Sequence, residues 1–552
     1  MTLLLIELTA VLPRSGVREE DAVRADSASV VQSRFASYLS DESGLGPGRA
    51  ETIFLPTSEK QVVDFLREMN SRRIPVTISG GRTGIVGGAV PEGGAVLSLD
   101  RMNGIVGIRW DEQSGEWHVT AEPGIRLKEF HERIAKKDLG GHTGSLSNQN
   151  WNDLSRFEKD PHQYFYPPDP TEESASLGGT VATDASGART YHFGRTRQYV
   201  RAVRIALATG DVLHIRRGEN MVDSSRVVRI NCLDSSEKTF QIPSYESPHV
   251  KSAAGYLSQK NMDLIDLFVG SEGTLGVITL IEVSLAVAPE HTTMFLAFFP
   301  SEEDAVRFAI RIRSLKAADM PLTVHSLEYF DNNSLRLLRG LKEEGKLEIG
   351  IKLPASDSAA AILCEFSYQD LPRAVEFLQQ PLEQFGSSPS SAVSGVDQVG
   401  KEQLRELRHA VPEAINKIVA QRKLHVPGTH KIGTDTSVPD EKLETMLNSY
   451  LTMLKASKLE YYMFGHIAEN HLHVNLLPTN EEELTEAEKL AEELAKEAVR
   501  LGGTVSAEHG IGKMKKSLLK IMFSQTEISQ MLATKRALDP NLILCPGNMI
   551  RV

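Results

Sequence analysis

The architecture is set by a glycine-rich segment that reads Ser79-Gly80-Gly81-Arg82-Thr83-Gly84-Ile85-Val86-Gly87-Gly88-Ala89-Val90-Pro91. Closely spaced glycines after a strand let successive backbone N–H groups approach an anion, which suits a pyrophosphate. The segment is not a Walker A loop, because no Gly-Lys-Ser/Thr follows, and it matches GxGxxG poorly. Taken alone, it is also compatible with a tight turn.

The residues around this loop predict alternating helices and strands. Pro56-Thr57-Ser58-Glu59 carries an N-cap and an acidic first turn ahead of an amphipathic helix at 61–70. Strands are predicted at 74–79 and 95–99, on either side of the glycine-rich loop. This order of elements is typical of an α/β cofactor-binding unit.

Farther along, residues 140–165 and 217–255 are polar and irregular, so we expect loops or insertions there. An apolar strand pattern ends near Ala288-Pro289-Glu290-His291, which predicts a domain boundary. Helical patterning resumes at 302–315. Residues 481–501 form a charged helix with a solvated face, ended by Gly502-Gly503.

Three further segments favour a cofactor site over a simple turn. They read Tyr166-Pro167-Pro168-Asp169-Pro170, Leu177-Gly178-Gly179-Thr180-Val181-Ala182-Thr183-Asp184-Ala185-Ser186-Gly187 and Gly270-Ser271-Glu272-Gly273-Thr274-Leu275-Gly276-Val277-Ile278-Thr279. At these residues the chain resembles FAD-linked oxidases and dehydrogenases of the vanillyl-alcohol-oxidase type. It looks most like the branch of D-lactate dehydrogenase, the glycolate oxidase catalytic subunit and D-2-hydroxyglutarate dehydrogenase. The resemblance runs in order from about residue 50 to the C-terminus.

The resemblance implies an α+β flavoprotein with two domains. Residues 1–49 would form an N-terminal extension and the start of the FAD domain, and residues 50–287 a FAD-binding domain of the vanillyl-alcohol-oxidase (PCMH) type. Residues 288–552 would form a C-terminal α+β FAD-linked-oxidase substrate or cap domain. Its last residues, from Leu538 on, are expected to pack back near the flavin.

Carried over residue by residue, the resemblance also implies the FAD contacts. They are Ser79, Gly80, Gly81, Arg82, Thr83, Gly84, Pro168, Asp169, Gly178, Gly179, Ala182, Thr183, Ser186, Gly187, Gly276, Val277, Ile278 and Asn548. Some relatives attach the flavin through a histidine in the first loop. Arg82 stands at that place here, so we expect non-covalent FAD. Two departures weaken particular contacts: the family's Tyr-Gly reads Phe193-Gly194, and its closing Asn-Pro-Gly-Lys reads Cys545-Pro546-Gly547-Asn548.

A second chemical centre is predicted by Gly465-His466-Ile467-Ala468-Glu469-Asn470-His471-Leu472-His473-Val474-Asn475 and Ala507-Glu508-His509-Gly510-Ile511-Gly512. The alternation from 471 to 477 places His471, His473 and Asn475 on one strand face. His466 lies just upstream, across a turn. With Glu508, His466 and His473 would supply the ligands of a catalytic divalent-metal site with open positions. Spacing alone is equally compatible with structural histidines.

The oxidation of a 2-hydroxy acid requires a group for the carboxylate, a base for the hydroxyl proton, and the α-hydrogen facing the flavin. In the resemblance, His509 is the base, Asn475 positions a substrate oxygen and Arg408 binds the carboxylate. Lys431 is a weaker carboxylate candidate, two residues from the family's position. Glu328 matches a cap-domain strand and is expected to be structural. His471 is an imidazole that the family pattern does not contain; we expect a structural or outer-shell role for it.

Composition limits the remaining alternatives. The net charge of −12 and the lack of a basic run argue against nucleic acid, and three widely spaced cysteines argue against a disulfide framework or an iron–sulfur cluster. The N-terminal apolar run is too short to span a membrane. We therefore expect a cytoplasmic protein, with a peripheral contact at the inner membrane face left open, and a homodimer as one possible assembly.

The predicted activity is FAD-dependent oxidation of a D-2-hydroxy acid such as lactate, glycolate or 2-hydroxyglutarate. A divalent metal, zinc or alternatively manganese, cobalt or iron, would assist. Electrons would pass to an electron-transfer flavoprotein, an iron–sulfur subunit, a quinone or oxygen. Two alternatives remain at this stage: a His/His/Glu metallohydrolase without flavin, and a non-catalytic FAD-binding subunit that relays electrons.

Overall fold

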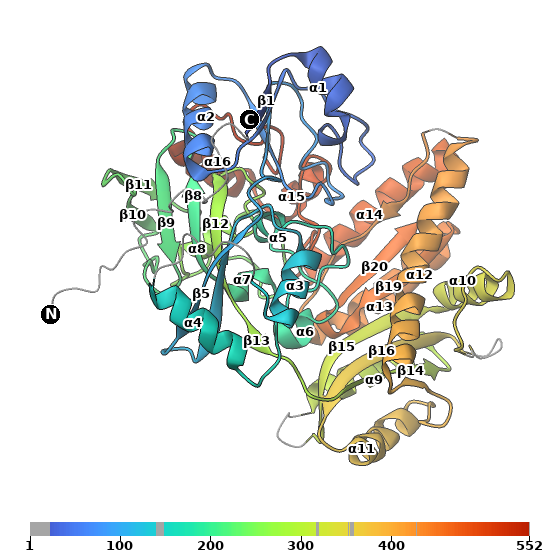
Figure 1. The fold of residues 1–552 in the computed structure, drawn as a ribbon. Coiled ribbons are helices and arrows are strands. Elements are labelled where there is room, and N and C mark those ends of the chain that lie inside the picture. The colour runs from blue at the N-terminus through green and yellow to red at the C-terminus, as the bar shows by residue number, and fades with distance from the viewer. Residues whose placement is uncertain are drawn as a thin grey trace.

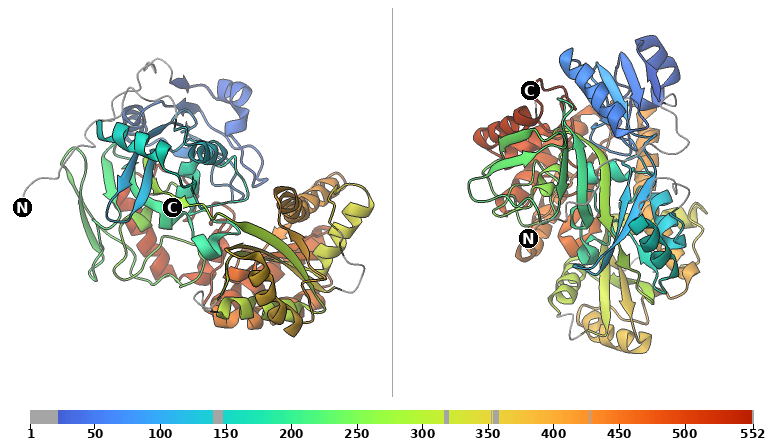
Figure 2. Two further views of the ribbon diagram at one scale, coloured as in Figure 1. Left: turned by 60° about the horizontal axis from the view of Figure 1, so that its bottom comes forward. Right: turned by 60° about the vertical axis from the view of Figure 1, so that its left-hand side comes forward.

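The computed structural model describes residues 22–139, 148–315, 320–351, 353, 358–426 and 428–550. The chain forms two lobes, with the N-terminal half in one and most of the C-terminal half in the other (Figures 1 and 2). Each lobe is built on β-sheets covered by helices, as the expected α+β fold requires.

The first lobe contains two main sheets. The smaller has the order β1 (Val23–Ala25), β2 (Thr52–Leu55), β4 (Ala95–Ser98), β3 (Val76–Ser79). Strands β2, β4 and β3 are parallel, because α2 (Glu59–Ser71) crosses over between them. The Ser58 side chain caps α2 by accepting from the Gln61 N–H, as the sequence predicts. The glycine-rich loop follows the C-terminal end of β3.

The larger sheet of this lobe is antiparallel. Its order is β5 (Ile105–Asp111), β6 (Glu116–Ala121), β12 (Val277–Ser284), β8 (Val200–Ala206), β9 (Val212–Arg216). The helices of this part are α1 (Ala28–Arg34), α3 (Leu127–Lys136), α5 (Leu177–Thr183), α6 (Thr190–Phe193), α7 (Thr196–Tyr199) and α8 (Ile265–Phe268). A short pair, β7 (Tyr164–Phe165) and β13 (Ala286–Val287), lies next to the lobe boundary.

Two segments differ from the expected loops. Helix α4 (Asn148–Lys159) occupies much of the 140–165 region, and residues 140–147 lie outside the described part. Strands β10 (Val227–Asn231) and β11 (Glu237–Gln241) form a hairpin inside 217–255. Both elements are rich in polar residues, which hides their periodicity in the sequence.

The second lobe is built on one seven-stranded sheet. Its order is β17 (Val393–Gly395), β14 (Thr292–Phe299), β16 (Ala360–Tyr368), β15 (Leu322–Asp331), β19 (Tyr461–His466), β20 (His471–Leu476), β18 (Ile432–Gly433). One face packs on α9 (Glu302–Ser314), α11 (Leu371–Gln384), α13 (Leu443–Ser457) and α14 (Glu481–Arg500). The other face is covered by α10 (Asn332–Glu343) and α12 (Gln398–Lys423).

The end of the chain returns to the first lobe through α15 (Lys516–Met522) and α16 (Gln525–Leu538). Leu544 pairs in parallel with Val76 of β3, and the Cys545 N–H donates to the Val76 carbonyl at 2.8 Å. The C-terminal segment therefore lies beside the strand that leads into the glycine-rich loop. Within the described ranges, no helix is long and apolar enough to cross a membrane.

Candidate active site

The histidine-rich segment folds as a tight β-hairpin. Strands β19 and β20 pair antiparallel, so that His466 lies opposite His471 and Phe464 opposite His473. Leu472, Val474 and Leu476 point into the core under the sheet. This leaves the histidines on the other face, as the alternation predicts.

Gly465 lies within β19, next to its last residue, and its φ of 137° is a conformation that favours glycine. A Cβ there would lie 2.9 Å from His473 Cδ2. The glycine therefore lets the imidazole of His473 lie directly against the neighbouring strand.

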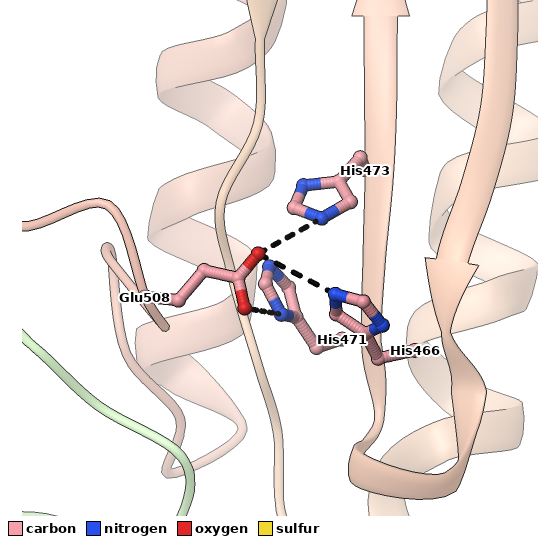
Figure 3. A group of neighbouring side chains, drawn as sticks. All are labelled: His466, His471, His473 and Glu508. Atoms are coloured by element: carbon pink, nitrogen blue, oxygen red, sulfur yellow. Dashed lines mark ion pairs between the residues drawn. The ribbon is translucent and has the colours of Figure 1, made fainter. Parts of the chain in front are cut away.

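Glu508 lies at the centre of the histidines (Figure 3). Its Oε1 is 3.4 Å from Nε2 of His466 and 3.4 Å from Nε2 of His473. Its Oε2 is 3.9 Å from Nδ1 of His471. One ligand atom from each of the four residues lies within 4.8 Å of the others, an arrangement that could hold a metal ion.

Glu328 of β15 holds His466 from behind. Its Oε1 is 2.6 Å from His466 Nδ1, and its Oε2 accepts from Arg408 Nε at 3.1 Å. Burial lowers the pKa of His466, but the charges of Glu328 and Glu508 outweigh it and raise the pKa to about 9. The Nδ1 atom of His466 faces Glu328, and its Nε2 atom therefore faces Glu508. This is the orientation expected of a metal-ligating imidazole.

Asp435 is the second buried carboxylate behind the cluster. Its Oδ1 is 3.1 Å from His471 Nε2, and its two oxygens accept the backbone N–H groups of Glu508 at 3.2 Å and of His509 at 3.1 Å. Lys515 Nζ lies 2.7 Å from its Oδ2. Burial alone would raise the pKa of Asp435, but the neighbouring His509 imidazole, the Lys515 ammonium and the contact with His471 hold it well below its usual range. Asp435 thus fixes the backbone of the Glu508-His509 pair.

Lys251 reaches the cluster from the first lobe. Its Nζ lies 2.8 Å from Glu508 Oε2 and 2.8 Å from Glu469 Oε2, and its side chain is 2% exposed. Burial opposes its charge, but the two carboxylates raise the pKa of Lys251 above its usual range. No sequence pattern predicts a role for Lys251, because it lies in an irregular segment without periodicity.

His509, Asn475 and Arg408 surround the same centre. The His509 ring stacks on His473 with centroids 5.3 Å apart, and burial lowers its pKa to about 4. Asn475 Nδ2 is buried and makes no hydrogen bond within the described residues. Among the described residues, Arg408 contacts Glu328 through Nε alone, so both of its Nη atoms are available. Lys431 instead donates to Asn416 at 2.9 Å and makes no hydrogen bond or ion pair with the cluster.

The glycine-rich loop fits an anion. Within the described residues, the backbone N–H groups of Arg82, Thr83 and Gly84 donate to no protein acceptor. A Cβ on Gly80 would lie 2.5 Å from Ser176 Oγ, which shows how closely the loop approaches the start of α5. Unpaired amides at the end of a strand suit a pyrophosphate.

Arg82 adopts φ 62° and forms an ion pair with Asp100 at 3.1 Å. Its guanidinium carbon lies 4.3 Å from the centroid of the Tyr38 ring. The Arg82 side chain is therefore held by protein groups.

The other predicted FAD segments converge on the loop. The Glu272 N–H donates to the Ala182 carbonyl at 2.7 Å, which joins the 270–279 segment to α5. A Cβ on Gly187 would lie 1.9 Å from the Asp169 carbonyl oxygen. Asn548 Nδ2 donates to the Gly88 carbonyl at 3.0 Å. Gly88 and Asn548, which are more than 400 residues apart in the sequence, are thus in direct contact.

Two contacts join the FAD segments to the histidine cluster. Ser186 Oγ donates to Glu508 Oε2 at 3.3 Å. The carboxylate of Glu272 accepts the N–H groups of Ile511 at 2.7 Å and Gly512 at 2.8 Å. The two motif groups of the sequence therefore lie in direct contact with each other.

This fold and this joint site define a two-domain flavin-binding oxidoreductase. The chain belongs to the FAD-linked oxidase family: residues 50–149 and 148–216 match the FAD binding domain, and residues 288–549 match the C-terminal domain of FAD linked oxidases. This confirms FAD as the cofactor and the two-domain α+β fold, and it removes the support for a hydrolase without flavin.

Named relatives span most of the chain. It is 26% identical over 524 residues to D-lactate dehydrogenase of Anaerostipes hadrus, covering 93% of this chain and 92% of the relative. It is 28% identical over 505 residues to glycolate oxidase subunit GlcD of Bacillus subtilis (strain 168), covering 90% and 88%. It is 27% identical over 509 residues to D-2-hydroxyglutarate dehydrogenase of Xanthomonas citri pv. viticola, covering 90% and 88%.

Solved structures confirm the fold alone. 4-Ethylphenol oxidase from Gulosibacter chungangensis has a TM-score of 0.61 at 16% identity, covering 94% of this chain and 93% of that one. Alkyldihydroxyacetonephosphate synthase has a TM-score of 0.58 at 17% identity, covering 91% and 77%.

Proposed function

We propose that this enzyme oxidises a D-2-hydroxy acid to the 2-oxo acid and passes the electrons through FAD to a separate acceptor. The observation that carries the proposal is the Glu508-His509 pair. It places a carboxylate among three imidazoles and a neutral base beside them, next to the FAD segments. The names of the relatives, which act on lactate, glycolate and 2-hydroxyglutarate, support the substrate class.

Arg408 and Asn475 would bind the substrate. The Nη atoms of Arg408, which make no hydrogen bond among the described residues, form a fork that suits a carboxylate, and Glu328 fixes the guanidinium through Nε. The unpaired Nδ2 of Asn475 can donate to a substrate oxygen, which would satisfy a buried donor that otherwise has no partner.

His509 would accept the hydroxyl proton. Burial lowers its pKa to about 4, so the ring is neutral and has a lone pair at neutral pH. Its Nδ1 lies 3.4 Å from Asp435 Oδ2, which orients the ring and leaves Nε2 for the substrate. As the proton moves to His509, the C2–H bond can release its hydride and the 2-oxo group forms.

FAD, when bound, accepts that hydride, and a divalent ion, when bound, acts as a Lewis acid toward the hydroxyl group. His466, His473 and Glu508 would hold the ion, since their ligand atoms lie within 4.8 Å and two of the donors are imidazole nitrogens. Zinc, manganese and iron all suit this donor set. The FAD would be bound non-covalently, because Arg82 replaces the histidine that forms the covalent link in some relatives.

The electron acceptor would be an electron-transfer flavoprotein, an iron–sulfur subunit or a quinone. The three cysteines, Cys232, Cys364 and Cys545, are buried and unpaired, and no two are close in sequence. This chain therefore offers no cluster ligands of its own among the described residues. A homodimer and a cytoplasmic or peripheral location remain predictions.

The proposal is tested by mixing the purified FAD-loaded protein anaerobically with a panel of D- and L-2-hydroxy acids and following the flavin absorbance. We expect at least one D-acid to bleach the flavin, and bleaching to slow after chelator treatment and to return with added metal. A protein whose flavin no hydroxy acid reduces, with or without metal, would contradict the proposal and favour an electron-relay role.

A further inference from the structure

His471 is a buried imidazole with one ring nitrogen that has no partner. Its side chain is 0% exposed, and its Nδ1 makes no hydrogen bond within the described residues. Buried polar groups in folded proteins are almost always hydrogen-bonded, so an exception calls for a specific explanation. A histidine that served only to support the fold would be expected to have a partner at this nitrogen as well.

The unpaired nitrogen faces the proposed metal position. His471 Nδ1 lies 3.9 Å from Glu508 Oε2, along the contact drawn in Figure 3. The ring centroid is 4.3 Å from that of His473 and 5.5 Å from that of His466. The ligand atoms of all four residues lie within 4.8 Å of one another.

The opposite nitrogen of His471 lies against a carboxylate. Its Nε2 is 3.1 Å from Asp435 Oδ1, and His466 likewise has its Nδ1 2.6 Å from Glu328 Oε1. Ligating imidazoles in metal sites usually have a carboxylate or carbonyl at the second nitrogen, which fixes the tautomer. His471 and His466 thus have the same arrangement, with the roles of the two nitrogens exchanged.

We propose that His471 is a fourth protein ligand of the same ion, so that three imidazoles and one carboxylate hold it. This inference rests on the divalent metal of the proposed function and deepens it. Four protein ligands would fill a tetrahedral zinc site, whereas a hydroxy acid that chelates needs two further positions. The site therefore fits an ion that accepts six ligands, of the manganese(II), iron(II) or cobalt(II) class.

The ligand count can be measured on the FAD-loaded protein without any turnover. After removal of bound metal with a chelator, the protein is titrated with manganese(II) and cobalt(II). X-ray absorption at the metal edge then counts the imidazoles. We expect three in the wild type and two in His471→Asn. The affinity of His471→Asn should fall by more than the roughly 10- to 100-fold typical of losing an outer-shell partner.

His325→Asn is the matched control. His325 is buried on β15 of the same sheet, with its Nε2 3.0 Å from Ser367 Oγ, and lies outside the cluster. Its replacement should leave metal affinity and ligand count unchanged.

Two imidazoles around the ion in the wild type would overturn the fourth-ligand assignment, and this result does not depend on how the variant folds. Equal affinity of His471→Asn and wild type would overturn it as well. In both cases the metal of the proposed function would stand. A wild type that binds no divalent ion but still oxidises a hydroxy acid would overturn both the assignment and the metal.

Discussion

Lys251 provides the sharpest test of how the two lobes cooperate at the site. Its ammonium is the cation nearest to Glu508 and Glu469, whose side chains are 11% and 12% exposed. Lys251→Met keeps the length of the side chain and removes the charge. In the metal-free protein, two buried carboxylates then lose their shared counter-ion.

Breaking a buried ion pair by removing one partner costs about 3–5 kcal/mol when the other charge stays buried and unpaired. This applies to Glu469, whereas Glu508 keeps His466 3.4 Å away. For a domain of this size such a loss corresponds to a fall of roughly 6–20 °C in melting temperature. Differential scanning calorimetry is the appropriate assay, because it resolves separate transitions in a multi-domain protein. Added manganese should restore part of the loss, since a bound cation neutralises Glu508 in place of Lys251.

Lys496→Met is the control for the loss of a lysine charge. Lys496 pairs with Glu492 and Glu493 on α14, but its side chain is 47% exposed. Exposed ion pairs contribute little to stability because solvent screens them, so this variant should melt close to the wild type. If Lys251→Met behaved like Lys496→Met in the absence of metal, the reasoning about the buried contact would be refuted.

Three further predictions concern other parts of the site and the sheet. Glu328→Gln removes the negative charge that contacts His466 Nδ1, and metal affinity measured by titration should fall about 10- to 100-fold. Unchanged affinity would show that this contact is only structural. Arg408→Lys loses the guanidinium fork that would bind the substrate carboxylate. We expect KM for the hydroxy acid to rise about 10- to 100-fold with a smaller change in kcat. A change in kcat alone would contradict the assigned role. Burial and the charge of Asp331 raise the pKa of Glu302 from 4.5 to about 7, so the folded state binds its proton more tightly than the unfolded state. Stability should therefore fall as pH rises from about 5 to 8, and Glu302→Gln should remove part of that dependence in calorimetry; an identical slope in the variant would rule this out.

The local patterns of the sequence predicted the elements that carry the chemistry. Strand alternation placed His473 and Asn475 on one face of β20, because only that register buries Leu472 and Val474. The glycine-rich loop after β3 was also predictable from local sequence, because its conformation depends on the backbone freedom of its own glycines. Four consecutive FAD motifs then identified the family.

Contacts between distant segments were not predictable in the same way. Lys251 reaches Glu508 where two irregular segments meet, and the Ala253 N–H donates to the Ser506 carbonyl there at 2.8 Å. No periodic pattern in the sequence singles out Asp435, and its contacts to Glu508, His509 and His471 depend on the same tertiary approach. Spacing alone could not show that His471 Nδ1 lies 3.9 Å from Glu508 Oε2 and makes no hydrogen bond within the described residues.

The most direct test of the account is the rate of anaerobic flavin bleaching by the best D-2-hydroxy acid in wild type and His509→Asn, with FAD content measured in both. A base in this position contributes about 10²- to 10⁴-fold. We predict a loss of that size in the variant while it keeps its FAD and its metal. Bleaching at the wild-type rate in His509→Asn would contradict the account.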